Sequence, residues 1–331
     1  MKEGNEMKVT VAMPISKEQL DALGNTVPGW SFEKRLSARL KREDLLDSDI
    51  IVGTVPTQIL HDLPNLKLLQ LDFAGSDNYA ALPLFHGEKA PVLANASGAF
   101  GVTIAEHMVG SVLFLLRGFG QYRDNMKEHK WSRDCVPGLI SGSRCLVLGL
   151  GDIGSCFAQR MHALGSTVTA VRRVPDRCPS YVESVHGQEE LDRLLPDADI
   201  IACCMPNTPQ TRKIINAHTL SLMKPTAVLL NVGRGSAIDS DALAEALFRH
   251  RIAGAALDVT DPEPLPGEHP LWDAPNCLIT PHVSGLSIQE DPQQKILGII
   301  ARNLLHFKEG RPVENEVDIQ TGYRKRPLPK D

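Results

Sequence analysis

Three residues with complementary chemistry follow apolar, strand-like runs in the second half of the chain. Arg234 follows the run in LLNVGR, Glu263 lies in DVTDPEP, and His282 ends CLITPH. In a doubly wound parallel sheet, active groups collect where the strands end. A guanidinium holds a carboxylate through two hydrogen bonds, and an imidazole paired with a carboxylate gives or takes a proton. Each residue alone also fits an ordinary structural role. Beside a dinucleotide site, the three together predict proton transfer on a carboxylate substrate.

A glycine-rich loop supplies that dinucleotide site. Three glycines in the pattern G-x-G-x-x-G follow the apolar run 144–150. The first permits a tight turn, the second lets the backbone approach a pyrophosphate, and the third lets helix and strand pack closely. The N-terminus of the next helix offers N–H groups and a positive dipole end to phosphate. The alternative is a turn with a structural use alone. The predicted phosphate-binding positions are Gly149, Gly151, Asp152, Ile153 and Gly154.

The next strand-like run, 167–171, ends in Arg172 and Arg173. An acidic residue usually stands here and accepts hydrogen bonds from the 2′-OH of the ribose, but the first carboxylate is that of Asp176. Two guanidiniums attract a 2′-phosphate. We therefore predict that NADP(H) is preferred and that NAD(H) is accepted as well. A solvated arginine pair at a strand end is the alternative.

The surrounding elements alternate between short apolar runs and helical patterns, which predicts an α/β fold with parallel sheets covered by helices. A long helix over 103–126 separates two series of strand-like runs, and a helix over 293–310 follows the second series. The six runs of the second series match a doubly wound Rossmann sheet. The first series comprises 8–15, 49–54, 66–72 and 91–96, and the second comprises 144–150, 167–171, 199–205, 227–232, 254–259 and 276–282.

We expect two domains, because 331 residues exceed the usual size of one. Residues 105–286 form the predicted dinucleotide-binding domain. Residues 1–104 and 287–331 form a discontinuous substrate-binding domain, if the last helix crosses back to the first series. A small-molecule site is expected where two such domains meet.

Composition excludes several other classes of protein. The net charge of −5 argues against a nucleic-acid partner. No apolar run reaches the roughly 20 residues that span a bilayer, and the N-terminus lacks a signal core, so we expect a cytoplasmic protein without membrane contact. Seven cysteines without a C-x-x-C pair predict buried or incidental thiols and no metal site.

Several segments together resemble the D-isomer-specific 2-hydroxyacid dehydrogenase family over nearly all of residues 8–318. The resemblance implies a Rossmann sheet inserted in a smaller flavodoxin-like α/β domain, in a protein similar to glyoxylate/hydroxypyruvate reductases or phosphoglycerate dehydrogenases. It also implies a homodimer built on residues 103–145. The segments are LDFAGSDN, TIAEH, GLGDIG, MPNTPQTRKIINAHTLSLMKPTAVLLNVGRGSAID, ALDVTDPEPLP and ITPHVSG.

The resemblance also assigns roles. Arg234 would bind the substrate carboxylate and orient the 2-oxo group. His282 would protonate the ketone oxygen as hydride arrives, and Glu263 would keep His282 charged and oriented. Asp258 would face the nicotinamide carboxamide. The backbone of Ala74, Gly75 and Ser76 would hold the carboxylate as well. Further cofactor-lining positions would be Met205, Pro206, Thr211, Val232, Gly233 and Gly285.

Departures from the family pattern leave the substrate open. Ser76 stands where valine is frequent, and SGLSIQED after His282 differs from the commoner Ala-Thr continuation. Glu263 argues against formate dehydrogenases, which have Gln before the histidine. The leading expectation is reduction of a small 2-oxo acid, such as glyoxylate, hydroxypyruvate or a phenylpyruvate-like compound, to the D-hydroxy acid. Without an evident basic cluster for a substrate phosphate, 3-phosphoglycerate is disfavoured. An NAD(H)-sensing corepressor without turnover and a phosphonate-type dehydrogenase are the alternatives.

Overall fold

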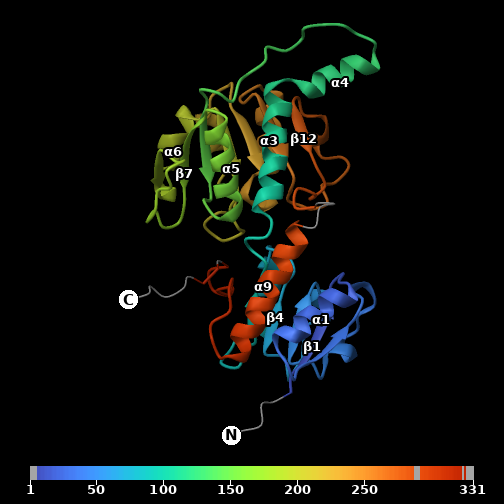
Figure 1. The fold of residues 1–331 in the computed structure, drawn as a ribbon. Helices are drawn as coiled ribbons and strands as arrows, with labels where there is room; N and C mark the ends of the chain where they lie inside the picture. The colour runs from blue at the N-terminus through green and yellow to red at the C-terminus, as the bar shows by residue number, and fades with distance from the viewer. Residues whose placement is uncertain (1–5, 287–290, 323, 326–331) are drawn as a thin grey trace. The chain divides into compact units, whose positions relative to one another are not determined.

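The computed structural model describes residues 6–286, 291–322 and 324–325, and the chain divides into two compact units (Figure 1). The divisions fall at 99/100 and 287/288, where the sequence-based prediction has 104/105 and 286/287. Part of the unusual segment after His282, residues 287–290, lies outside the described residues. Unit 1 is Met1–Ala99 with Ile288–Asp331, and unit 2 is Phe100–Ser287.

The sheet of unit 1 has five parallel strands in the order β2-β1-β3-β4-β5, which is the flavodoxin-like order. Four of the strands fall within predicted runs. The edge strand β2 was missed because its sequence, SFEK, is half polar and none of its residues is buried. The strands are β1 (Lys8–Ala12), β2 (Ser31–Lys34), β3 (Ile50–Gly53), β4 (Leu68–Gln70) and β5 (Val92–Ala94).

Helices cover both faces of this sheet. On one face, Ile300 and Leu304 of α9 and Leu23 of α1 pack against Val9 and Val52. Short helical turns and α2 cover the other face. The helix predicted over 293–310 is α9, so the end of the chain belongs to the same unit as its beginning. The helices are α1 (Lys17–Thr26), α2 (Asp77–Ala80) and α9 (Asp291–Lys308), with 3₁₀ turns at Ser37–Arg39, Arg42–Leu45, Thr57–Ile59 and Pro83–Phe85.

The sheet of unit 2 has seven parallel strands in the order β12-β11-β10-β9-β6-β7-β8. Six of them reproduce the doubly wound Rossmann order, and β12 adds a seventh. The strand β8 was missed because it is a three-residue edge strand without a fully buried side chain. The strands are β6 (Arg144–Leu148), β7 (Thr167–Val171), β8 (Ser184–His186), β9 (Ile200–Cys203), β10 (Val228–Asn231), β11 (Gly254–Leu257) and β12 (Cys277–Ile279).

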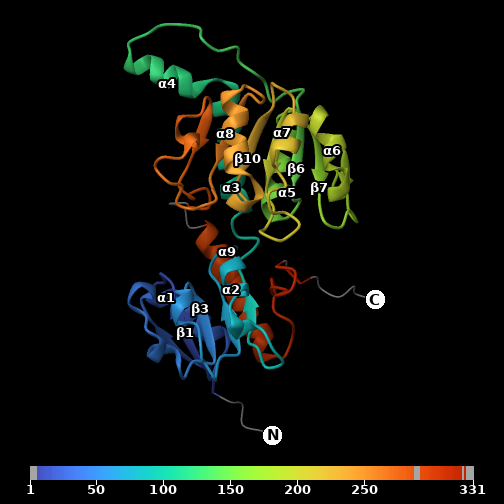
Figure 2. The ribbon, with the colours of Figure 1, turned by 180° about the vertical axis from the view of Figure 1, so that it is seen from behind.

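Alternate residues of these strands face opposite helical layers. Val147 packs with α3 and α5, whereas Leu146 and Leu148 pack with α6, α7 and α8. Figures 1 and 2 show the two layers from opposite sides. The α-helices are α3 (Gly101–Leu116), α5 (Asp152–Ala163), α6 (Leu191–Leu194), α7 (Ala217–Leu222) and α8 (Ser240–Phe248), and 3₁₀ turns occupy Gln188–Glu190, Leu195–Asp197, Gly235–Ala237 and Pro270–Asp273.

The single long helix predicted over 103–126 is wrong. It is broken after Leu116, and α4 (Phe119–Lys127) continues at a bend of 65°. Gly118 makes the break with a φ of 64°, a conformation that glycine adopts without steric cost. Among the described residues no single helix is long and apolar enough to cross a membrane, although this bent pair reaches that length and composition together.

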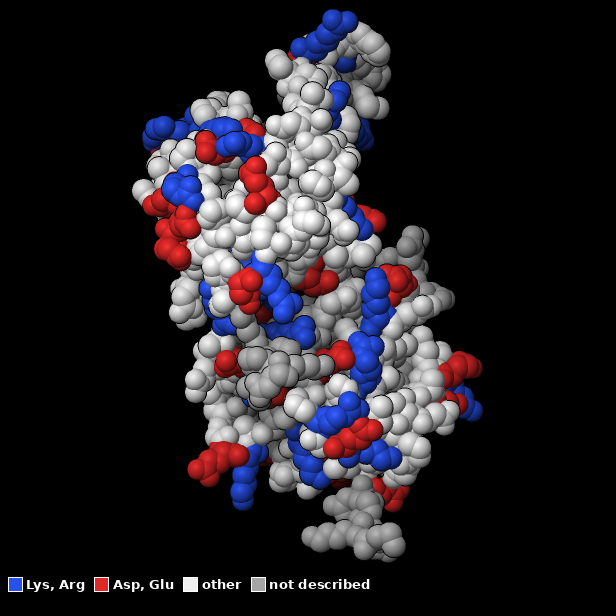
Figure 3. All heavy atoms as spheres, turned by 60° about the vertical axis from the view of Figure 1, so that its left-hand side comes forward, with Lys and Arg blue, Asp and Glu red and all other residues white. Residues whose placement is uncertain are grey.

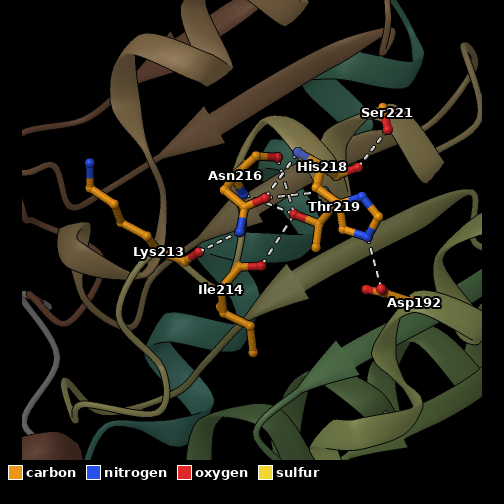
Figure 4. Close-up of polar contacts among 7 residues, drawn as sticks. All are labelled: Asp192, Lys213, Ile214, Asn216, His218, Thr219 and Ser221. Atoms are coloured by element: carbon orange, nitrogen blue, oxygen red, sulfur yellow. Dashed lines mark hydrogen bonds and ion pairs between the residues drawn. The ribbon is translucent and has the colours of Figure 1, made fainter.

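The loop after β9 is fixed by a capping arrangement at α7 (Figure 4). Asn216 Oδ1 accepts hydrogen bonds from the N–H groups of His218 (2.9 Å) and Thr219 (3.3 Å), and Thr219 Oγ1 accepts one from the Asn216 N–H (2.8 Å). His218 Nε2 lies 2.8 Å from Asp192 Oδ2 of α6. Two neighbouring helices are thereby tied together below the loop that carries Thr211.

Charges of both signs are interspersed over the face drawn in Figure 3. Several belong to short-range pairs, such as Lys224 Nζ with Asp199 Oδ1 (2.7 Å) and Arg302 Nε with Glu314 Oε1 (2.9 Å). Exposed pairs of this kind each contribute at most about 1 kcal/mol, so they balance charge locally more than they stabilise the fold.

Candidate active site

The predicted site residues of unit 2 lie at the carboxyl ends of neighbouring strands. The sheet order therefore lines them up along one edge, as expected for a doubly wound fold. Across the sheet they are Arg172 after β7, Gly149 after β6, Met205 after β9, Arg234 after β10, Asp258 after β11 and His282 after β12.

The glycine loop has the geometry that a pyrophosphate needs. Gly149 has a φ of 98°, which suits the tight turn. Gly151 is the N-cap of α5, and a Cβ built on it meets no atom within 4 Å, so its backbone is approachable. A Cβ on Gly154 would lie 1.9 Å from Gly149 O, so only glycine permits this contact between helix and loop. These positions fit a dinucleotide phosphate at a helix N-terminus.

The other two predicted residues of this loop differ in their surroundings. Asp152 begins α5, and its Oδ1 lies 2.5 Å from the position of a Cβ built on Gly101, so its carboxyl group is directed at the start of α3. Ile153 packs partly buried against the core cluster shared by α3 and α5. Gly285 lies near the same helix, with Phe100 Cδ1 3.5 Å from its built Cβ.

Arg172 has an internal anionic partner. Its Nη1 lies 3.5 Å from Asp176 Oδ1, and its backbone N–H donates to His186 O (3.0 Å). Arg173 is exposed at the same strand end. The guanidinium of Arg172 is therefore held at the end of β7 by a carboxylate that occupies the place a phosphate would take.

The ends of β9 and β10 are packed closely together. A Cβ on Gly233 would lie 2.4 Å from Met205 O, and Val232 N donates to Cys203 O (3.1 Å). Thr211 is buried, and its Oγ1 donates to Pro206 O (2.7 Å). The predicted cofactor-lining residues of these two loops therefore form one continuous surface.

Asn231 fixes the turn that carries Arg234. Its Nδ2 donates to Arg234 O (2.8 Å), and its Oδ1 accepts from Gly233 N (3.1 Å). Arg234 Nη1 in turn donates to Gly233 O (2.8 Å). A Cβ on Gly235 would lie 1.9 Å from Thr260 O, so this turn also packs against the loop that leads to Glu263.

His282 and Glu263 are in direct contact. His282 Nδ1 lies 2.7 Å from Glu263 Oε1, and the two side chains are 51% and 41% exposed. Both are thus accessible to a substrate while bonded to each other. A carboxylate bonded to Nδ1 leaves Nε2 for exchange of a proton.

Asp258 organises the turn before His282. Its carboxylate accepts hydrogen bonds from Thr280 Oγ1 (2.6 Å), Val283 N (2.9 Å) and Ser284 N (3.0 Å), and its backbone oxygen accepts from His282 N (2.9 Å). Burial alone would raise the pKa of Asp258, but hydrogen bonds from Ser284, Thr280 and Val283 outweigh burial and lower it. Asp258 is therefore a buried, ionised carboxylate. Its predicted role toward a carboxamide stays a prediction.

The predicted carboxylate-binding turn belongs to unit 1. Ala74 O accepts a hydrogen bond from Asn95 Nδ2 (2.8 Å), and the same Nδ2 lies 3.5 Å from Ser76 Oγ. Ser76 is buried, and Gly75 between the two is partly exposed. Asn95 therefore holds the shape of the turn.

Sequence reasoning missed Asn231, Thr280 and Asn95, which act through other residues. Each is a polar residue at the end of an apolar strand, which is the signal that would have drawn attention to them. The seven cysteines are free. Burial raises the pKa of Cys203 and Cys277 to about 12, which makes both thiols unreactive. In the described part of the chain no group of three His, Cys, Asp or Glu residues could hold a metal ion.

Comparison with known proteins identifies this arrangement. Residues 109–284 match the family model for the NAD-binding domain of D-isomer-specific 2-hydroxyacid dehydrogenases. The chain belongs to this family. The family assignment makes the protein an NAD(P)-dependent D-2-hydroxyacid dehydrogenase, and it confirms the resemblance and the α/β Rossmann-type fold predicted from the sequence.

Individual relatives show how far the similarity extends. A glyoxylate/hydroxypyruvate reductase A from Photorhabdus laumondii is 30% identical over 240 residues, which are 70% of this chain and 72% of that protein. A D-3-phosphoglycerate dehydrogenase from Archaeoglobus fulgidus is 29% identical over 328 residues, 95% of this chain but 59% of that protein. A family member from Xanthobacter autotrophicus, solved in complex with NADPH and MES, superimposes with a TM-score of 0.81 at 28% identity, covering 96% of this chain and all of that one.

Proposed function

We propose that the dehydrogenase reduces a small 2-oxo acid to the D-2-hydroxy acid with NADPH as its preferred cofactor. The observation that carries the proposal is the 2.7 Å contact between His282 Nδ1 and Glu263 Oε1, at the sheet edge that also carries the glycine loop and Arg234. In this proposal unit 2 binds the dinucleotide and unit 1 contributes substrate contacts through Ala74, Gly75 and Ser76.

The residues of the chain have separate tasks. Arg234 binds the substrate carboxylate and so orients the neighbouring 2-oxo group. His282 donates a proton from Nε2 to the ketone oxygen, while Glu263 stabilises the imidazolium and fixes its direction. The bound nicotinamide supplies the hydride. Asp258 and Thr280 keep the backbone of His282 in place during the reaction.

Preference for NADPH rests on Arg172, supported by Arg173 and by the absence of a carboxylate at the end of β7. A 2′-phosphate carries more charge than the Asp176 carboxylate, so it can displace Asp176 from the guanidinium. The relative solved with NADPH is consistent with this choice of cofactor. NAD(H) remains a cofactor that the glycine loop would accept with lower affinity.

The arm formed by α4 and the following segment supports a homodimer. It presents Trp131 and Val136 fully exposed, together with Phe119, Met126 and Leu139. Apolar side chains gathered in this way mark a protein interface. Sedimentation of the wild type and of Trp131→Ser with Val136→Ser tests this, since a dimer should dissociate in the double variant and a monomer would sediment unchanged.

Steady-state kinetics with NADPH and NADH against glyoxylate, hydroxypyruvate and phenylpyruvate tests the activity. We expect turnover with at least one acid and a higher kcat/KM with NADPH. NADPH binding without turnover of any 2-oxo acid would contradict the proposal and favour the corepressor-like alternative. Oxidation of phosphite in the same assay would favour the phosphonate-type alternative.

A further inference from the structure

Thr54 and Asp72 face each other at the carboxyl ends of β3 and β4 in unit 1. These strands pair in parallel with Val52 opposite Gln70. The same register, continued by two residues, places Thr54 opposite Asp72. Thr54 Oγ1 donates a hydrogen bond of 2.7 Å to Asp72 Oδ1. The pair is thus positioned by the sheet itself and not by a loop alone.

Asp72 has no cationic partner. Its side chain is hydrogen-bonded by Thr54, and no Lys, Arg or His within the described ranges forms an ion pair with it. Burial raises the pKa of Asp72 despite the hydrogen bond from Thr54. A desolvated carboxyl group without a cation opposes folding once it ionises. Asn or Ser would accept the same hydrogen bond without this cost, so a structural role does not account for an acid here.

The position of Asp72 relates it to the carboxylate-binding turn. It precedes Ala74 by two residues, and the turn is held by Asn95 from the end of the neighbouring strand β5. Ligands of open parallel sheets bind outside the carboxyl ends of the strands. In a 2-oxo acid the third carbon is two bonds from the carboxylate, so a carboxylate held by the turn places the C3 substituent close to this edge.

We propose, on the basis of the proposed 2-oxo acid reductase activity, that Asp72 and Thr54 determine which C3 substituent the enzyme accepts. The pair selects an uncharged, hydrogen-bonding substituent such as the hydroxyl group of hydroxypyruvate. The hydroxyl donates a hydrogen bond to the carboxyl group of Asp72. A second carboxylate, as in oxaloacetate, is rejected because it would meet an acid that no cation neutralises.

The test compares kcat/KM for hydroxypyruvate and oxaloacetate in the wild type and in Asp72→Asn. Asparagine keeps an acceptor for Thr54 and for a substrate hydroxyl, but it removes the negative charge. We expect the ratio of hydroxypyruvate to oxaloacetate to fall at least about tenfold, which corresponds to about 1.4 kcal/mol. The matched control is Asp21→Asn, which makes the same charge change at an exposed position on α1 and should leave the ratio within about twofold.

A second variant separates selection of the substituent from folding. Thr54→Val removes the donor to Asp72 but keeps its charge, so rejection of oxaloacetate should persist. If Asp72→Asn leaves the ratio unchanged while the wild type reduces hydroxypyruvate, the inference fails and the proposed function stands. If the wild type reduces no 2-oxo acid, the proposed function itself fails. Thermal unfolding of each variant checks that a changed ratio comes from folded protein.

Discussion

His282 reaches Glu263 from a left-handed backbone conformation. Its φ is 52°, and its Nδ1 lies 2.7 Å from Glu263 Oε1. This conformation is uncommon for residues other than glycine and is kept only where surrounding bonds impose it. Here the His282 N–H donates to Asp258 O (2.9 Å). The direction of the imidazole is therefore set by the backbone of β11 as well as by Glu263.

Loss of the imidazole should remove proton transfer while leaving cofactor binding intact. We expect His282→Ala to lower kcat by about 10²–10⁴-fold, the usual contribution of a general acid or base. Glu263→Gln keeps a hydrogen bond to Nδ1 but loses the charge, so its loss should be smaller. NADPH fluorescence titration should give the same Kd for both variants and the wild type.

Glu268→Gln serves as the control for these two variants. Glu268 is exposed in the same loop as Glu263, and the substitution makes the same chemical change. Activity close to that of the wild type is expected. Equal loss in Glu263→Gln and Glu268→Gln would show that general disturbance of the loop, and not the contact with His282, accounts for the effect.

The fold was predictable where burial leaves a periodic signal. All six predicted runs of the second series contain strands, because these strands lie between two helical layers and are apolar throughout. The missed strands β2 and β8 are edge strands with partly exposed residues, so their sequences lack that signal. The break at Gly118 was missed because the apolar pattern before it suits a continuous helix.

The site was predictable to the extent that strand ends define it. Arg234, Glu263 and His282 were identified because each is a reactive group directly after a strand. The partners Asn231 and Thr280 do no chemistry themselves, and their hydrogen bonds depend on which strands are neighbours. The ion pair of Arg172 with Asp176 depends on how the chain turns after β7, which the sequence does not specify.

Two glycines of the phosphate loop should respond differently to alanine. A Cβ on Gly154 would lie 1.9 Å from Gly149 O, so Gly154→Ala must move the helix or the loop and should lower Tm. A Cβ on Gly151 meets no protein atom within 4 Å, and its φ of −89° suits alanine. Gly151→Ala should therefore keep the wild-type Tm but bind NADPH more weakly, because the methyl group occupies the space in front of the backbone. Differential scanning fluorimetry with and without NADPH separates the two effects. A normal NADPH affinity in Gly151→Ala would contradict the assigned phosphate site.

Arg172 should control the choice between the two cofactors. A hydrogen bond to a charged group contributes about 1.5–3 kcal/mol, so Arg172→Ser should raise KM for NADPH by about 10–100-fold and change KM for NADH little. Asp176→Asn removes the competing carboxylate and should lower KM for NADPH. Arg249→Ser, at an exposed pair on α8, is the control for loss of a positive charge. If Arg172→Ser affected both cofactors equally, the guanidinium would have a structural role and no role in cofactor selection.

Asp258 should make the stability of the protein depend on pH in the acid range. Hydrogen bonds hold the pKa of this carboxyl below its usual range despite burial, so the folded state binds fewer protons than the unfolded state. The stabilisation is therefore complete above the unfolded pKa of about 3.9 and is lost as pH falls through the folded pKa. Asp258→Asn lacks this stabilisation and places an amide donor against the Val283 or Ser284 N–H, which should cost about 1–3 kcal/mol at pH 7.

The measurement is the difference in unfolding free energy between wild type and Asp258→Asn, from urea titrations at pH 3, 5 and 7. The difference should be equal at pH 5 and 7, because Asp258 is ionised in both states of the wild type. It should shrink at pH 3, where the unfolded wild type takes up a proton that the folded form resists. Asp241→Asn, an exposed residue of α8, should give a small difference at every pH. A difference for Asp258→Asn that is as large at pH 3 as at pH 7 would mean that the lost contacts are independent of charge, and that Thr280, Val283 and Ser284 do not require an ionised partner to hold the His282 turn.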